Sequence, residues 1–406
     1  MKLRKRPLAR LGAAVLLASG AFTALGTPAQ AADTETDLAI DAVDIRTTSK
    51  AEEKMAWVKV RNLGPNTPSE LRISANLNAA EFNKFTIWPW DRTYCEADSY
   101  QYEVRGWTCH VQEEQLPGPG ETLEFPLVAF RLSSGVTTSS GTVTYSIQSK
   151  DDTNPENNTK TGEIELTTES GVDLGLLVPD VKTRIEWAKY DEVDGSEPPL
   201  YPGDETVAFA YIVNQGDLTA DGVDLKITLP RGVTFSADLK ECAYTPDRRT
   251  ADCRSGLTQL KSGEDLLGVF PVKVAANVKA PVSLDGGSAE VSSRGSVPAG
   301  VKSLAPAKLP SFLREVAGDE VPKGPDLDES DNSDDFAVIV AKKKTDEGGA
   351  GGGDGGGDGG LPVTGPQAGL IGSVGIAAAV AGGALYLAAR RRRVVLVTPG
   401  DEKPTA

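Results

Sequence analysis

The fold is indicated by the stretch Trp57-Val58-Lys59-Val60-Arg61-Asn62-Leu63-Gly64, which has a counterpart later in the chain. The counterpart is Phe209-Ala210-Tyr211-Ile212-Val213-Asn214-Gln215-Gly216. Both stretches alternate in the manner of a half-buried strand and run into an Asn-x-Gly turn. Such a repeat at a long separation predicts an internal duplication of one structural unit.

Further segments repeat in the same order in the two halves. The matching pairs are residues 71–73 with 225–227, 123–126 with 267–271, 143–147 with 288–291, and 162–166 with 336–340. A polar turn precedes the last segment of each half. This shared order supports an internal duplication that sets the architecture of the chain.

The strand-like segments are short and bounded by turns, and no long helical period appears between them. This pattern predicts an all-β fold with two tandem Ig-like β-sandwich domains, at residues 32–169 and 170–345. The second domain has an extra segment near residues 294–325, rich in Pro, Ala and Gly. We expect a surface loop there, with a short helix at residues 310–316.

Four cysteines allow three disulfide connectivities. Because the duplication places one close pair in each half, we predict the bonds Cys95–Cys109 and Cys242–Cys253. The cysteine spacings are too wide for a zinc knuckle, and the single histidine is His110. We therefore expect no metal site and no cofactor.

A distinctive series of segments ends the chain. A Gly-rich linker at 346–360 precedes the pentapeptide Leu361, Pro362, Val363, Thr364, Gly365. Residues 366–389 follow as an expected transmembrane helix, and their apolar run from Ala368 to Ala389 is long enough to cross roughly 30 Å of hydrocarbon. The block Arg390, Arg391, Arg392, Arg393 begins a tail at 390–406, and we expect it to stop transfer and stay in the cytoplasm.

Pentapeptide, apolar span and basic block together resemble the sorting signal of Gram-positive surface proteins. The resemblance implies that a sortase cleaves between Thr364 and Gly365 and joins Thr364 to a peptidoglycan precursor. The expected location is then the cell wall, reached through a membrane-anchored precursor. The alternative is a permanent transmembrane anchor that is never cleaved, since the spanning segment would look the same.

The N-terminus has the features of a secretory signal peptide at residues 1–31. Its basic region contains Lys2, Arg4 and Lys5, and an apolar region follows at 11–25. The small residues before Ala32 predict cleavage between Ala31 and Ala32. An exported chain is free to form disulfides.

The second half contains the segments Gly203–Val207, Tyr211–Gly216 and Leu229–Phe235, followed by the pair Cys242 and Cys253. Together these residues resemble a bacterial surface repeat known as domain of unknown function eleven. The first half departs from the pattern at 76–78. The resemblance implies an Ig-like scaffold and no particular chemistry.

Aromatic residues crowd one stretch of the first half, and Trp88, Trp90 and Trp107 are its largest members. Exposed rings of this kind could bind a glycan or a protein partner, whereas buried rings would pack in the core. An acidic turn at residues 326–335 lacks the pattern of a calcium loop, so a solvated turn is expected. A Lys–Asn isopeptide bond is chemically possible in such sandwiches, but no motif marks one.

The composition argues against several functions. There is one histidine, no Gly-rich phosphate loop after a strand and no metal cluster, so we expect no enzyme. The net charge of −16 disfavours nucleic-acid binding. We predict a non-catalytic surface protein that acts as a spacer or interaction module for an unknown protein or glycan ligand. The alternatives are a carbohydrate-binding wall module or a simple membrane-anchored protein.

Overall fold

The computed structural model describes residues 35–343, except for 52, 78–83, 101–102, 133–134, 194, 255–258, 294–312 and 317–325. The predicted signal peptide, Gly-rich linker, sorting pentapeptide, apolar segment and arginine block lie outside these residues. The described residues form β-strands and four 3-10 helices of three residues each. None of the helices in this part of the chain is long and apolar enough to cross a membrane.

The first half folds into two sheets that share one core. One sheet has the order β1(Leu38–Ala42), β3(Glu53–Asn62), β8(Thr122–Arg131), β5(Phe85–Pro89). The other has the order β2(Ile45–Thr48), β10(Thr159–Thr167), β9(Ser139–Gln148), β4(Arg72–Leu77), β7(Glu103–His110), β6(Cys95–Tyr100). Alternate residues of both sheets, such as Val58, Ile73 and Tyr145, are buried between them. This is a β-sandwich, in which period-two side chains meet across the two inner faces.

The second half repeats the arrangement. One sheet has the order β11(Leu174–Leu177), β12(Glu205–Asn214), β19(Asp265–Val274), β15(Val233–Phe235), with β21(Leu313–Val316) also paired to β19. The other has the order β16(Cys242–Tyr244), β17(Thr250–Arg254), β14(Val223–Thr228), β20(Val282–Ser293), β22(Ser333–Val340). The short strands β13(Ala220–Asp221) and β18(Gln259–Leu260) form a separate pair. Its core is a second cluster that contains Ile212, Ile227 and Phe270.

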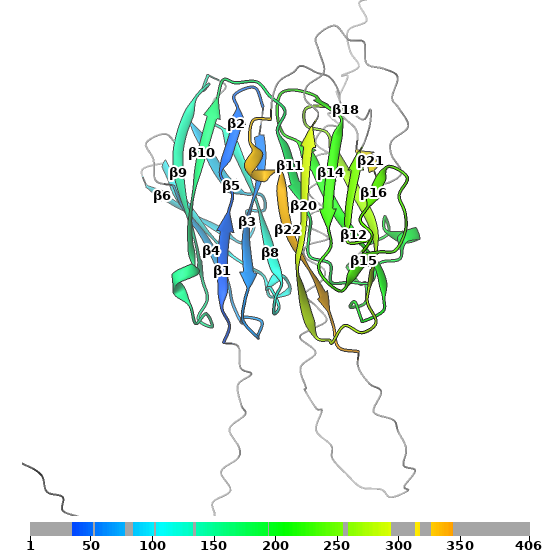
Figure 1. Cartoon of the computed structure of the whole chain (residues 1–406). Coiled ribbons are helices and arrows are strands. Elements are labelled where there is room, and N and C mark those ends of the chain that lie inside the picture. Colours follow the sequence, from blue (N-terminus) through cyan, green and yellow to red (C-terminus); the bar gives the residue numbers. More distant parts are fainter. Residues whose placement is uncertain are drawn as a thin grey trace, which may run out of the picture. The chain divides into compact units, whose positions relative to one another are not determined.

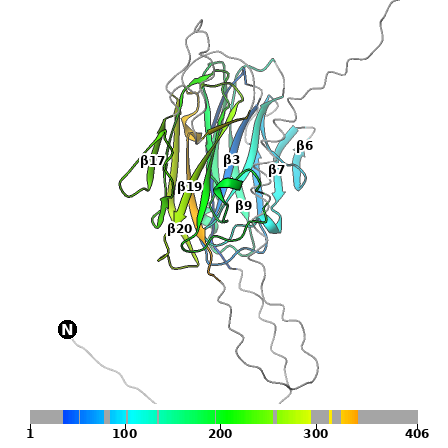
Figure 2. The same cartoon turned by 90° about the vertical axis from the view of Figure 1, so that its right-hand side faces the viewer.

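Among the described residues, nine strands of each sandwich match in order, whereas β2 of the first and β13, β18 and β21 of the second have no counterpart. The order β1, β3, β8, β5 corresponds to β11, β12, β19, β15, and β10, β9, β4, β7, β6 corresponds to β22, β20, β14, β17, β16. Figure 1 shows the strands of the first sandwich in blue to teal and those of the second in green to orange. Figure 2 shows the same strands turned by 90°. The all-β, Ig-like fold predicted from the duplication is confirmed. The first core ends at Leu166 and the second begins at Val172.

Both Asn-x-Gly turns are built in the same way. Asn62 and Asn214 are fully buried, and each side-chain oxygen accepts the N–H of the glycine two residues later. Each side-chain amide also donates to two carbonyls: those of Asn66 and Pro117 for Asn62, and those of Leu218 and Leu260 for Asn214. A Cβ on either glycine would collide with backbone, which explains why this position needs glycine.

The disulfides Cys95–Cys109 and Cys242–Cys253 are both present, as predicted. The first joins β6 to β7 and the second joins β16 to β17, in each case between directly paired residues. The two bonds are equivalent in the duplicated topology. Each ties an edge strand to its sheet.

The prediction of a helix within residues 310–316 is wrong for 313–316, which form strand β21. This strand pairs antiparallel with residues 265–268 of β19. The short strand β15 covers only residues 272–274 of β19 and leaves the rest of that edge unpaired. The open backbone groups of β19 therefore favour an added strand over an isolated helical turn.

Candidate functional site

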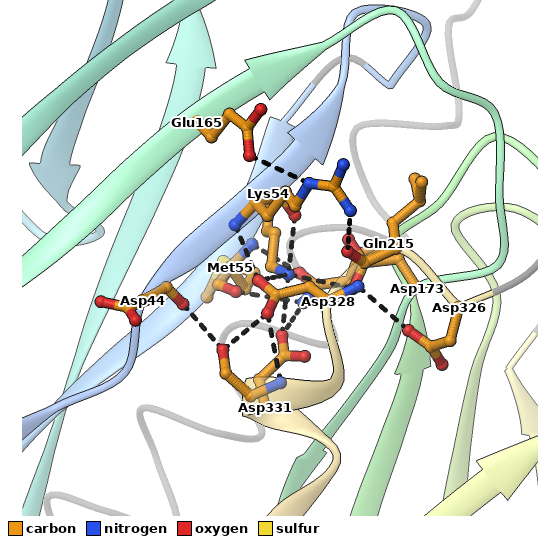
Figure 3. A network of polar contacts seen from close by, with 12 residues as sticks. Asp44, Lys54, Met55, Glu165, Asp173, Gln215, Asp326, Asp328 and Asp331 are labelled. Atoms are coloured by element: carbon orange, nitrogen blue, oxygen red, sulfur yellow. Dashed lines mark hydrogen bonds and ion pairs between the residues drawn. The ribbon is translucent and has the colours of Figure 1, made fainter.

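Lys54 is the centre of a buried polar cluster that joins the two sandwiches. It lies near the start of β3, on the same face as the core residues Ala56 and Val58, and is only 1 % exposed. Its Nζ lies 2.9 Å from Oδ1 of Asp173, 2.6 Å from Oδ2 of Asp328 and 3.1 Å from Oδ2 of Asp331 (Figure 3). One cation of the first half thus meets three carboxyl groups of the second.

The three acids come from two places in the second sandwich. Asp173 directly precedes β11 and is fully buried. Asp328 caps the 3-10 helix η4(Glu329–Asp331), where its side chain accepts the N–H of Ser330, and Asp331 ends that helix. The expectation of a solvated turn at residues 326–335 is wrong for Asp328 and Asp331, which are buried. Lys54 supplies the positive charge beside these acids. The described residues contain no group of acids, histidines or cysteines placed to hold a metal ion.

The cluster shifts the protonation of its members. Burial lowers the pKa of Lys54, but the three nearby carboxylates outweigh it and raise the pKa above its usual value. Burial raises the pKa of Asp173 to about 7 and that of Asp331 well above its usual range, despite Lys54. At Asp328 burial is outweighed by Lys54 and by hydrogen bonds, so its pKa is lowered. The Lys54 ammonium therefore lies beside one carboxylate that stays ionised, Asp328, and two acids whose raised pKa favours the protonated form, Asp173 and Asp331.

The side chain of Gln215 hydrogen-bonds to the backbone of β3 next to Lys54, in the way that a neighbouring strand would. Its Oε1 accepts the N–H of Met55 at 2.5 Å, and its Nε2 donates to the carbonyl of Met55 at 3.1 Å. Nε2 also lies 3.3 Å from Oδ2 of Asp331. Gln215 follows Asn214 in the duplicated turn, so the turn of the second sandwich also binds β3 of the first.

A second buried group lies further along the same strand. Lys59 pairs with Asp334 of β22, and Glu124 of β8 lies near both. Burial and the charge of Asp334 together raise the pKa of Glu124 well above its usual value. The groups at Lys54 and Lys59 are together called the interdomain seam below.

Asp180 extends the seam by binding both sandwiches. One of its oxygens accepts the N–H of Thr122 in the first sandwich, and the other accepts that of Ala337 in the second, each at 2.7 Å. Burial raises the pKa of Asp180 to about 6, although both hydrogen bonds oppose the shift. Nearby, Lys182 pairs with Glu121 at 3.2 Å.

Most ion pairs across the seam have the same orientation, with the cation on the first half and the acid on the second. Besides Lys54 and Lys59, the pairs are Lys50 with Asp217 and Arg61 with Asp285. The reverse pair is Lys182 with Glu121. This complementarity specifies how the halves meet, because sliding one half would leave buried charges unpaired.

Sequence reasoning missed the seam. The signal was a lysine in the apolar phase of a strand, since Lys54 precedes Ala56, Val58 and Val60 on one face. A lysine at such a position is rarely buried without a partner. The sequence does not say where that partner lies, because the acids come more than a hundred residues later.

The three tryptophans proposed to bind a ligand do not form one exposed face. Trp107 is 1 % exposed, packs in the first core and donates from Nε1 to the carbonyl of Ile87 at 3.2 Å. Its proposed role in binding is therefore corrected to core packing. Trp88 and Trp90 are half-buried, and Arg92 lies 4.7 Å over the ring of Trp88.

No protein-family model matches the chain, and no curated protein matches it. Among solved structures, the partial N-terminal region of an enterococcal surface protein aligns with TM-score 0.23 and 10% identity, over 68% of this chain and 94% of that one. A type I cohesin from Pseudobacteroides cellulosolvens aligns with TM-score 0.22 and 8% identity, over 32% and 94%. A PapD-like domain of human CEP192 aligns with TM-score 0.20 and 10% identity, over 37% and 97%. Similarity at this level does not identify a function.

Proposed function

We propose that the chain is a non-catalytic, exported surface protein whose two Ig-like sandwiches act as one stiff display unit. The observation that carries the proposal is the burial of Lys54 of the first sandwich among Asp173, Asp328 and Asp331 of the second. Breaking these contacts would leave buried charges without partners, which is strongly unfavourable. Two domains joined in this way resist bending at their junction.

The connection between the sandwiches supports the same role. Only six residues separate the end of β10 at Thr167 from the start of β11 at Leu174. Within that connection Asp173 is bound by Lys54, and Gly171 donates to Asp217 at 2.9 Å. A flexible tether would leave its polar groups to solvent, whereas this one is fastened at both sandwiches.

We propose further that a sortase attaches the mature chain to peptidoglycan through Thr364. The support is the order of pentapeptide, apolar segment and four arginines after a Gly-rich linker, together with the signal-peptide pattern at the N-terminus. The stiff unit would then act as a spacer or as a platform for an unknown partner. The carbohydrate-binding alternative requires exposed rings, and Trp107 is buried in the core. The spacer or interaction role is therefore preferred.

Cell fractionation of wild type and Thr364→Ala tests the anchor. The expected result is that wild type is released only by enzymes that digest peptidoglycan, while the variant moves to the membrane or the medium. Extraction of wild type by detergent alone would instead mean a permanent membrane anchor.

Pulsed spin-label distance measurements test the stiffness independently of anchoring. Labels replace Leu132 and Trp187, two exposed residues on different sandwiches. Wild type should show a narrow distance distribution, and Lys54→Met a broad one. A broad distribution in wild type would reject the stiff unit without affecting the anchoring proposal.

A further inference from the structure

The seam places an amine and carboxyl groups in direct contact, away from solvent. We propose that Lys54 and Asp173 condense to an amide, so that the two sandwiches become joined by a covalent cross-link. The proposal concerns a modification site within the folded domains, and it does not depend on sortase processing. It requires only that the two sandwiches meet as described.

The geometry favours reaction because the partners are held together and water is excluded. Nζ of Lys54 lies 2.9 Å from Oδ1 of Asp173, and these side chains are 1% and 0% exposed. Such contact converts a reaction between two separate molecules into one within a single site, which can accelerate it by many orders of magnitude. Exclusion of water also protects the amide from hydrolysis once it has formed.

Asp173 is a better electrophile than Asp328. Asp328 is held as a carboxylate by the N–H groups of Arg46 and Ser330 and by the hydroxyl of Ser330. Oδ2 of Asp173, in contrast, is buried and has no hydrogen-bond partner among the described residues. An oxygen in that position favours the protonated acid, and burial does raise the pKa of Asp173. The acid form is the one that can lose its hydroxyl group.

Asp331 is placed to carry protons. Its Oδ2 lies 3.1 Å from Nζ of Lys54, while its Oδ1 is buried without a partner in the described part of the chain. Asp328 meanwhile holds the amine in position at 2.6 Å. The cluster therefore contains a nucleophile, an electrophile and a separate proton carrier within one buried site.

The reaction needs no other reactant. When Asp331 is ionised, Lys54 gives one proton to its carboxylate, and the free amine attacks Cγ of protonated Asp173. The bond from nitrogen to Cγ forms as the bond from Cγ to the hydroxyl oxygen breaks. Asp331 returns its proton to the leaving hydroxyl and takes one from nitrogen, so that one amide and one water molecule result.

Intact mass measurement of the purified, denatured wild-type chain tests the proposal directly. The expected mass, with both disulfides counted, is lower by one water molecule than the sequence requires. Lys54→Arg, which keeps the charge and cannot form the amide, should show the full mass. Lys59→Arg is the matched control, because Lys59 also pairs across the seam, and it should keep the loss.

Tryptic mapping identifies the linked residue. A bond to Asp173 joins the peptide 51–59 to the peptide 161–182, with Lys54 left uncut, and fragmentation separates Asp173 from Asp180. A bond to Asp328 or Asp331 would instead join 51–59 to 324–342 and overturn the assignment to Asp173. Full mass in wild type, with Lys54 cut normally, would overturn the cross-link altogether. The wild-type measurements alone test whether the cross-link forms, even if a variant fails to fold.

Asp173→Asn gives a further check on the mechanism. The same attack on an amide would release ammonia, so the variant should lose the mass of one ammonia molecule instead of one water. Asp331→Ala removes the proposed proton carrier while leaving the reacting pair. It should slow the appearance of the cross-link after refolding, and an unchanged rate would exclude Asp331 from that role.

Discussion

Nζ of Lys54 lies 2.6 Å from Oδ2 of Asp328, although the two residues are 274 positions apart in the chain. The contact spans the two copies of a duplicated sandwich. It exists because Lys54 interrupts the core face of β3, while Asp328 caps a helix just before the last strand of the second copy.

Lys54→Met should destabilise the chain by roughly 3–5 kcal/mol, because it removes the cation from three buried acids while keeping a side chain of similar length. Urea unfolding measures the free energy of unfolding. Lys160→Met is the control, since Lys160 pairs with Asp41 at the surface, and its cost should stay below about 1 kcal/mol. Equal effects of the two variants would mean that the buried cluster adds little.

Asn62→Ala and Asn214→Ala should each cost roughly 2–4 kcal/mol, because each leaves two carbonyls and one glycine N–H without their side-chain partner. The two stability costs should be similar because the two turns have equivalent geometry. Asn66→Ala is the control, because the Asn66 side chain makes an exposed bond to the carbonyl of Glu35. A large cost at only one of the two turns would contradict their equivalence.

Asp180→Asn should make the chain more stable relative to wild type as pH rises. Between its unfolded pKa near 4 and its folded pKa of about 6, Asp180 holds more proton in the folded state than in the unfolded state. Ionisation of this carboxyl therefore lowers the free energy of unfolding as pH rises, by up to roughly 3 kcal/mol. The amide side chain of the variant does not titrate, so the variant lacks this loss.

Unfolding of both proteins at about pH 4 and pH 7.5 measures this effect. The difference between variant and wild type should move in favour of the variant at the higher pH. A difference that does not change with pH would show that Asp180 is not held in this environment.

Trp107→Ala should cost roughly 3–5 kcal/mol, because it empties a large volume in the first core. Trp187→Ala should change the free energy of unfolding by about 0.5 kcal/mol or less, since Trp187 is 41% exposed. Thermal or chemical unfolding of both variants provides the measurement. A small effect at Trp107 would return it to the candidates for ligand binding.

The duplication of strands was predictable because hydrophobic alternation and Asn-x-Gly turns are local signals that occur twice. The match of residues 57–64 with 209–216 became the match of β3 with β12, and the disulfides followed from the same duplication. Residues 313–316 were misread, because their strand depends on an unpaired edge of β19 that no local pattern reveals. Trp107 could not be placed, since aromatic residues suit a core and a binding face equally well.

The sequence by itself determined that this chain contains two copies of a disulfide-bonded β-sandwich, because strand period, turn chemistry and cysteine spacing act over short distances. Only the tertiary structure decided that the copies are joined through Lys54, Gln215 and the acids of the second copy. Those residues lie far apart in the chain, and even the position of Lys54 on the apolar face of its strand does not say where its partners lie. Burial then makes their pairing energetically decisive, because a charge removed from water must meet its counterpart.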